Sequence, residues 1–185
     1  MKEKLNLHEL LPEKREYSFE EGVEKIIQKI EFLLGGQDYV VVAIYGPTLN
    51  DTDVGKSTLK SAICSYFIRN NMPVISPDRL DYLPHHLKNL EIPQESYASN
   101  KGVIILGALD CVIKKKDPRS DEIVEKYKKI EDSRVAKICK EGDLPVSKID
   151  FRVLIYRPDR GSLEDFDSPM ADMVIRNDQA IDKLR

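Results

Sequence analysis

Gly55, Lys56, Ser57 and Thr58 follow one another, and this combination of residue types is suited to holding phosphate groups. A glycine lets backbone amides approach phosphate oxygens, because a Cβ would obstruct them. A lysine supplies a mobile positive charge for the β- and γ-phosphates of a nucleotide, and the first hydroxyl is a suitable Mg²⁺ ligand. The predicted site for the phosphates of a nucleotide comprises Gly46, Gly55, Lys56, Ser57 and Thr58, with Ser57 as the ligand of Mg²⁺, and these residues leave ATP and GTP both open.

The spacing of this loop is irregular. Four residues usually separate the first glycine from the Gly-Lys pair, whereas eight separate Gly46 from Gly55. The simplest interpretation is a four-residue insertion within residues 48–53. Asp51 and Asp53 then lie near the expected polyanion, where like charges about 4 Å apart repel by roughly 1 kcal/mol in water. Either these acids impair the site, or they face solvent or help to hold the metal.

The elements around the loop occur in the order that a phosphate-binding loop requires, a strand before it and a helix after it. Residues 39–45 (YVVVAIY) form a continuous apolar run, which predicts a strand buried on both faces in the centre of a parallel sheet. Ser18 and Glu21 have the spacing of a capping box, and a helix is predicted from there to Gly35. Further strands are predicted at residues 73–76, 102–106, 151–156 and 173–175, and further helices at residues 57–69 and 121–141.

The alternation of strands and helices predicts an α/β fold, a three-layer doubly wound sandwich with a mainly parallel sheet. The chain has 185 residues, which fits a single domain over residues 1–185. Residues 1–17 are interpreted as an N-terminal extension. Residues 84–100, which contain Pro84 and Pro93, are interpreted as an irregular excursion.

Composition excludes several classes of protein. The net charge is −3, so the basic excess typical of nucleic-acid binders is missing. No apolar stretch reaches the roughly 20 residues of a membrane span, and the charged N-terminus lacks the apolar core of a signal peptide. The three cysteines contain no Cys-x-x-Cys pair. We therefore expect a cytoplasmic protein that binds neither nucleic acid nor membrane.

The sequence resembles the uridine kinase-like branch of the P-loop kinases. The likeness runs through SFEEGVEKI, VVVAIYGP, GKST, PVISPD, GVIILGALD and ADMVIRND, and covers about two-thirds of the chain. It implies a P-loop NTPase fold and transfer of a phosphoryl group from Mg-ATP to a small hydroxyl acceptor. Lys56 and Asp78 would be catalytic, with Asp78 as the general base and Asp81 as a second candidate. The simpler interpretation of Asp78 is that it caps the following turn.

The acceptor pocket and the lid depart from this family. Tyr82, His85 and His86 are candidates to line the acceptor pocket, although each is more simply a surface side chain. Where the family carries Glu-Gly after the third strand, this chain has Leu106-Gly107, with Asp110 further on. The arginine-rich lid of the family is reduced to RPDRGSLEDFDSPMAD.

Arginines that could replace those of the family lid are few. Arg157 and Arg160 are the best remaining candidates within the short lid, and a salt-bridged surface role is equally compatible with each. Arg134 and Lys137, on the helix predicted at residues 121–141, are further candidates.

Three functions therefore stay open. The first is the phosphotransferase just described. The second is a degenerate P-loop protein that binds nucleotide or phosphate without catalysis and acts through a partner. The third is an NTPase switch whose missing arginine comes from a partner or from a second copy in a homo-oligomer, as arginine fingers can.

Overall fold

The structure, a computed structural model, describes residues 16–46, 54–77, 80–90, 101–109, 120–160 and 171–178. Its strands are β1 (Glu16–Ser18), β2 (Tyr39–Tyr45), β3 (Val74–Ile75), β4 (Gly102–Leu109), β5 (Phe151–Tyr156) and β6 (Met173–Arg176). Its α-helices are α2 (Phe19–Leu34), α3 (Lys56–Arg69), α4 (Leu83–Leu90) and α5 (Ser120–Glu141), and η1 (Leu80–Tyr82) and η2 (Pro158–Arg160) are short 3-10 helices. Within these ranges no helix is both long and apolar enough to cross a membrane.

The strands form one sheet in the order β1-β6-β5-β2-β4-β3, in which every neighbouring pair is parallel. Strand β2 lies inside the sheet, where Val42 pairs with Ile105 of β4 and with Phe151 of β5. Residues 40–45 of β2 are all buried, as the uninterrupted apolar run predicts. The predicted α/β class is thus confirmed, and the carboxyl ends of all the strands lie at one edge of the sheet.

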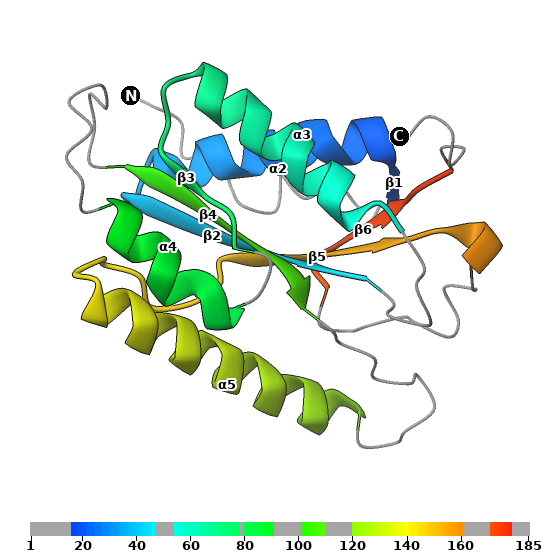
Figure 1. Cartoon of the computed structure of the whole chain (residues 1–185). Coiled ribbons are helices and arrows are strands. Elements are labelled where there is room, and N and C mark those ends of the chain that lie inside the picture. The colour runs from blue at the N-terminus through cyan, green and yellow to red at the C-terminus, as the bar shows by residue number, and fades with distance from the viewer. Residues whose placement is uncertain are drawn as a thin grey trace, which may run out of the picture.

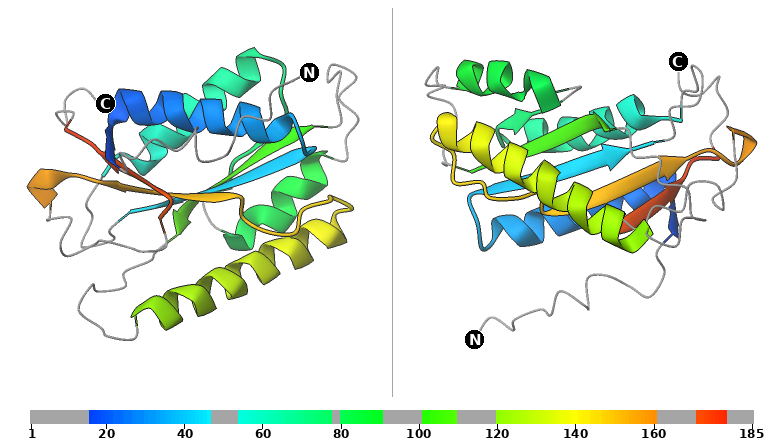
Figure 2. Two further views of the ribbon diagram at one scale, coloured as in Figure 1. Left: turned by 180° about the vertical axis from the view of Figure 1, so that it is seen from behind. Right: turned by 90° about the horizontal axis from the view of Figure 1, so that it is seen from below.

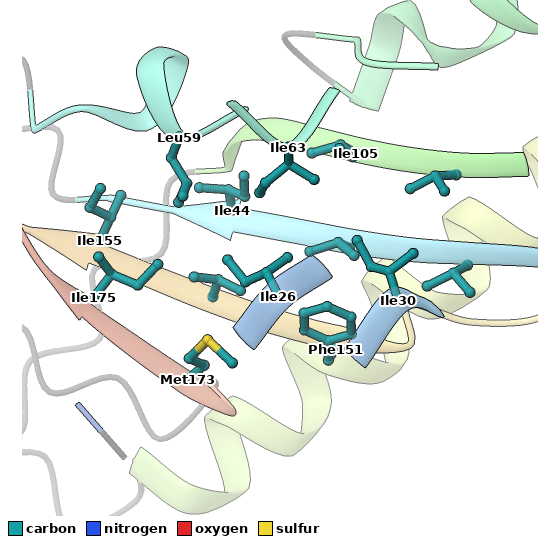
Figure 3. Close-up of a cluster of buried hydrophobic side chains, with 14 of the residues drawn as sticks. Ile26, Ile30, Ile44, Leu59, Ile63, Ile105, Phe151, Ile155, Met173 and Ile175 are labelled. Atoms are coloured by element: carbon teal, nitrogen blue, oxygen red, sulfur yellow. The ribbon is translucent and has the colours of Figure 1, made fainter. Parts of the chain in front are cut away.

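Helices α2 and α3 cover one face of the sheet (Figure 1). Their apolar side chains pack on the strand residues that point to that face, and Figure 3 shows the resulting cluster. Ile26 and Ile30 of α2 and Ile63 of α3 are fully buried there. Burying such a side chain contributes about 1.5–3 kcal/mol, so this layer is a large part of the core that holds α3, and with it the Gly-Lys-Ser-Thr sequence, against β2.

Helices α4 and α5 cover the opposite face (Figures 1 and 2). Leu83 and Leu87 of α4 and Val135 and Cys139 of α5 pack there on the alternate residues of the strands, such as Val41. Strand side chains alternate between the two faces, so a sheet with both faces covered by helices needs strands that are apolar throughout. The helices and the sheet form three layers.

The local signals for α2 are realised as predicted. The Ser18 hydroxyl accepts a hydrogen bond from the Glu21 amide (3.3 Å), and the Glu21 carboxylate accepts one from the Ser18 amide (3.4 Å). This reciprocal pair satisfies two amides that the first turn would otherwise leave without acceptors. The helix ends at Gly35, whose amide donates to Phe32 and Leu33 carbonyls.

Two regions correct the sequence predictions. Residues 16–18, the first two of them assigned to an N-terminal extension, form β1 beside β6; three residues are too few to give a strand pattern. The irregular excursion predicted at residues 84–100 is wrong in its first part, where α4 spans Leu83–Leu90. Pro84 is tolerated there because a helix does not use the amides of its first turn. Residues 91–100, with Pro93, lie outside the described residues.

Candidate functional site

The two ends of the irregular loop meet at the carboxyl end of β2. A Cβ on Gly46 would lie 2.8 Å from Cγ2 of Val54 and 2.9 Å from Cδ of Lys56. Only a glycine therefore allows Val54 and the lysine side chain to approach the end of the strand this closely. Residues 47–53, which contain Asp51, Asp53 and the predicted insertion, lie outside the described residues. The contact nevertheless fits an insertion between two halves of one motif, because the halves are adjacent in space.

Gly55 takes a backbone conformation that favours glycine. Its φ is +94°, in the left-handed region, and it forms the N-cap of α3. A Cβ at this position would lie 2.4 Å from Nδ2 of Asn177. That amide nitrogen donates a buried hydrogen bond to the Val54 carbonyl (3.0 Å). Asn177, at the carboxyl end of β6, thus fixes the backbone immediately before Gly55.

The start of α3 is suited to an anion. The first backbone hydrogen bond of the helix runs from the Leu59 amide to the Gly55 carbonyl (2.9 Å). The amides of Ser57 and Thr58 precede it, at the positive end of the helix dipole. No side chain caps this end, in contrast to α2. Ser57 is exposed, and Lys56 and Thr58 are partly buried, so the predicted phosphate ligands that follow Gly55 gather at one point.

These residues fit a phosphate group and its metal. Backbone amides, an ammonium group and hydroxyl groups are the hydrogen-bond donors from which phosphate oxygens accept, and all three kinds gather at the start of α3. The Ser57 hydroxyl is at the helix start, where it can serve as one oxygen ligand of Mg²⁺ while phosphate oxygens supply others. Among the described residues, no group of three His, Cys, Asp or Glu side chains could hold a metal by itself.

Of the two candidate general bases, Asp81 lies among the described residues and Asp78 does not. Asp78 falls between β3 and η1 in the sequence. Asp81, in η1, accepts a hydrogen bond from Nη2 of Arg134 of α5 (2.7 Å), and both side chains are exposed. Arg134 therefore reaches the segment that follows β3. An ion pair so exposed contributes about 0–1 kcal/mol, and it engages the Asp81 carboxylate. Lys137 is exposed further along α5.

The residues proposed for the acceptor pocket lie on η1 and α4. Tyr82 is 53% exposed, His85 is exposed and His86 is partly buried. The two histidine rings contact each other edge to face, with their centroids 6.2 Å apart. These exposures match those of ordinary surface residues.

Strand β4 lacks the acid that the family would place there. Leu106 is fully buried against α4 and α5, as its position in the second apolar cluster requires. Gly107 faces α3 instead, and a Cβ on it would lie 3.3 Å from Cδ and 3.4 Å from Nζ of Lys60. A lysine thus lies beside the end of β4 where the family pattern would add a carboxylate one residue earlier. Asp110 lies outside the described residues.

Of the two lid arginines, only the side chain of Arg157 lies in the described part of the structure. This candidate for the lid or for a salt-bridged surface role is only 5% exposed, at the carboxyl end of β5. Its Nε and Nη2 donate to the two carboxylate oxygens of Asp159 (3.0 and 3.1 Å). The side chain of Arg160 is outside the described part of the structure. The salt bridge is therefore present, but the arginine is buried.

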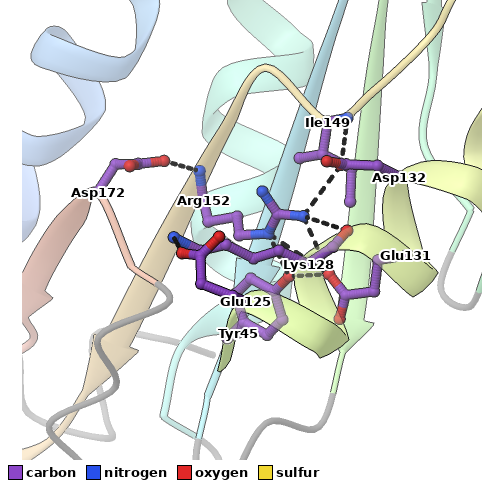
Figure 4. A network of polar contacts seen from close by, with 8 residues as sticks. All are labelled: Tyr45, Glu125, Lys128, Glu131, Asp132, Ile149, Arg152 and Asp172. Carbon is purple, nitrogen blue, oxygen red and sulfur yellow. Dashed lines mark hydrogen bonds and ion pairs between the residues drawn. The ribbon is translucent and has the colours of Figure 1, made fainter. Parts of the chain in front are cut away.

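Sequence reasoning missed a polar network on the other face of β2. The Tyr45 hydroxyl, one residue before Gly46, donates to Glu131 of α5 (2.5 Å) and accepts from Nε of Arg152 of β5 (3.1 Å). Nη2 of Arg152 also pairs with Asp132 (3.1 Å). Burial and the neighbouring Glu131 carboxylate raise the pKa of Tyr45, so the phenol stays protonated. Figure 4 shows how this network joins α5 to the strand that carries the loop.

Two signals could have directed attention to these groups. Arg152 is a lone charge within an otherwise apolar strand, and such a charge is buried only with partners. Asn177 directly follows the last strand at the carboxyl edge of the sheet, where ligands bind in folds of this class. Neither signal identifies the partner, because Asn177 and Val54 are 123 positions apart.

Comparison of the chain with family models, with curated proteins and with solved structures finds no match. The resemblance to uridine kinases therefore remains a prediction from short motifs, and the geometry at the carboxyl end of β2 carries the functional proposal.

Proposed function

We propose that this chain is a P-loop phosphotransferase, which binds Mg-ATP through the loop ending in Gly55–Thr58 and transfers the terminal phosphoryl group to a small hydroxyl acceptor. The observation that carries the proposal is Gly55. Its left-handed backbone, with a neighbour that excludes any Cβ, starts a helix directly at the end of an inner, fully buried parallel strand. Ligands of open parallel sheets bind outside the carboxyl ends of the strands, where successive connections leave on opposite faces.

The direction of the connections supports this location. The chain leaves β2 toward α3 on one face and leaves β4 toward α5 on the other (Figure 1). Strands β2 and β4 are neighbours, so the carboxyl ends of these two strands form such a switch point. The finer assignment of the fold as that of a P-loop NTPase belongs to this proposal.

The roles of the residues follow from their chemistry. Lys56 and the amides of Ser57 and Thr58 would neutralise phosphate charge, and the Ser57 hydroxyl would hold Mg²⁺, which supplies electrostatic stabilisation of the transferring group. Asp78 would accept the proton of the acceptor hydroxyl if it lies within hydrogen-bond reach. The protein would be cytoplasmic, and its ligands would be a nucleotide and a small hydroxyl compound.

A second candidate function is a nucleotide- or phosphate-binding protein without catalysis that acts through a partner. Leu106 favours it, because this fully buried apolar residue stands where the family carries a carboxylate. Loss of one acid would weaken metal or acceptor binding while leaving the phosphate loop intact.

Transfer of labelled γ-phosphate from ATP to a panel of nucleosides and other hydroxyl compounds tests the proposal and separates the two functions. A kinase gives labelled product, and Asp78→Asn lowers its turnover by at least a hundredfold while ATP binding is unchanged. If ATP binds the wild type and no acceptor is labelled, the second function holds. If neither ATP nor inorganic phosphate binds, both are wrong.

A further inference from the structure

Arg157 is a buried cation whose guanidinium is only partly used. Asp159 engages Nε and Nη2, and this carboxylate is itself 56% exposed, on the solvent side of the pair. Nη1 is buried and has no hydrogen-bond partner within the described part of the chain. A buried donor on a charged group is costly to leave without an acceptor. The guanidinium is therefore oriented by one carboxylate and keeps a further buried donor, Nη1, without an acceptor among the described residues.

Strand register places Arg157 beside the residue that fixes the phosphate loop. Ile155 pairs with Ile175 and Tyr156 with Arg176, so the next pair in register is Arg157 with Asn177. The Asn177 amide donates to the Tyr156 carbonyl (2.8 Å), which continues the ladder to this point. The Asn177 side chain in turn holds the carbonyl of Val54.

Strand alternation places Arg157 on the same face as the loop. Ile155 and Ile175 point to the face covered by α2 and α3, as Figure 3 shows. Residues two positions further along a strand point to the same face, which is where Asn177 meets Gly55. Cδ1 of Ile155 lies 3.6 Å from the position of a Cβ on Gly55. Arg157 thus follows directly after a residue pair that packs under the start of α3.

A second Arg-x-Asp pair shows that burial is not a property of this local motif. Arg176 of β6 binds Asp178 through the same spacing, with Nε 3.0–3.1 Å from both carboxylate oxygens. Its side chain is 47% exposed, whereas that of Arg157 is 5% exposed. Both pairs lie at carboxyl ends of neighbouring strands, but Arg176 points to the opposite face. Only the arginine on the face of the loop is buried with a donor left over.

We propose that Arg157 binds a second anionic group of the ligand whose first phosphate is held by the loop. The site then selects a chain of at least two phosphoryl groups, a di- or triphosphate, over a single phosphate. Asp159 is the positioning residue that fixes the guanidinium in advance. This inference rests on the proposed phosphate loop. It differs from a mobile lid arginine because the group is already buried and oriented at the end of a strand.

Calorimetric titrations with inorganic phosphate and with pyrophosphate test the proposal. The wild type should bind pyrophosphate more tightly than phosphate. Loss of a hydrogen bond to a charged group lowers binding affinity by about ten- to hundredfold. Arg157→Gln should therefore weaken pyrophosphate binding by that factor and change phosphate binding by less than about threefold. Arg176→Gln, which removes the same charge from the exposed pair, should change neither. Asp159→Asn should lower the ratio of the affinity for pyrophosphate to the affinity for phosphate, and leave the affinity for phosphate unchanged.

The possible failures can be told apart. Loss of both affinities in Lys56→Ala together with unchanged affinities in Arg157→Gln would overturn this inference and leave the phosphate loop standing. Failure of the wild type to bind pyrophosphate would overturn both. If Arg157→Gln does not fold, the wild-type protein still decides: the Nε–H resonance of Arg157 should shift on saturation with pyrophosphate but not with phosphate, and equal or absent shifts would refute the role of this arginine.

Discussion

Replacement of Gly55 by alanine should both strain the loop and displace Asn177. An L-residue in the left-handed region costs roughly 1–2 kcal/mol, and φ here is +94°. The new Cβ would lie 2.4 Å from Nδ2 of Asn177, so the amide must move away. Its buried bond to the Val54 carbonyl would then be lost, at about 1–3 kcal/mol. Together these effects predict that Gly55→Ala lowers the free energy of unfolding by about 3 kcal/mol.

A double-mutant cycle with Asn177→Ala tests this reasoning. Asn177→Ala alone removes the same hydrogen bond and should cost about 2 kcal/mol. In the double variant the steric conflict is gone and the bond is lost only once, so the cost should again be about 3 kcal/mol, well below the sum of the single costs. The expected coupling is therefore about 2 kcal/mol, which is within the range seen for residues in contact.

Urea unfolding followed by circular dichroism measures these free energies. Gly36→Ala is a suitable control, because Gly36 is not in the left-handed region and the nearest atom to its Cβ position is 4.0 Å away. It should change the free energy of unfolding by less than about 0.5 kcal/mol. Strictly additive costs for Gly55→Ala and Asn177→Ala would refute the contact between Asn177 and the loop.

Three further changes probe the elements around the loop. Tyr45→Phe removes the hydroxyl between Glu131 and Arg152 and should cost about 2 kcal/mol in urea unfolding; a neutral result would mean that the network does not hold α5 to β2. Ser18→Ala should cost about 1 kcal/mol by removing the cap of α2, and an unchanged midpoint would contradict the capping box. Burial raises the pKa of the Cys139 thiol from 9.0 to about 11, so its contribution to stability is intact below pH 9 and is lost as pH rises through 11. Cys139→Ala should therefore reduce the fall in unfolding free energy between pH 8 and pH 11 by about 2 kcal/mol, and identical pH profiles would refute this.

Much of the fold could be predicted because its strands are buried on both faces. The run at residues 39–45 has no polar residue, so it identifies an inner strand of a parallel sheet without any knowledge of its neighbours. The capping box at Ser18 and the double glycine after Leu34 likewise mark helix ends locally. Strand β1 was not predicted, because three residues are too few to show the alternation of a strand. Helix α4 was not predicted, because Pro84 was interpreted as a helix breaker, although the first turn of a helix accepts proline.

Only the part of the site that is formed by residues adjacent in the sequence could be predicted. Gly-Lys-Ser-Thr after a buried strand predicts a helix start, and α3 begins at Lys56 as the motif requires. The contact between Asn177 and Val54 depends on strand order, which the sequence does not display. The sequence leaves Arg157 either a lid arginine or a salt-bridged surface residue, whereas its burial follows from the face to which β5 directs it.

The most direct measurement is a calorimetric titration of Mg-ATP into the wild type and into Lys56→Ala. Lys140→Ala is the matched control, because it removes the same charge from an exposed lysine in the last turn of α5. If the loop ending in Gly55–Thr58 holds phosphate, the wild type and Lys140→Ala bind Mg-ATP saturably with equal affinity and Lys56→Ala loses at least tenfold. Equal binding by all three proteins, or no binding to a folded wild type up to millimolar ATP, would contradict a phosphate site at this loop.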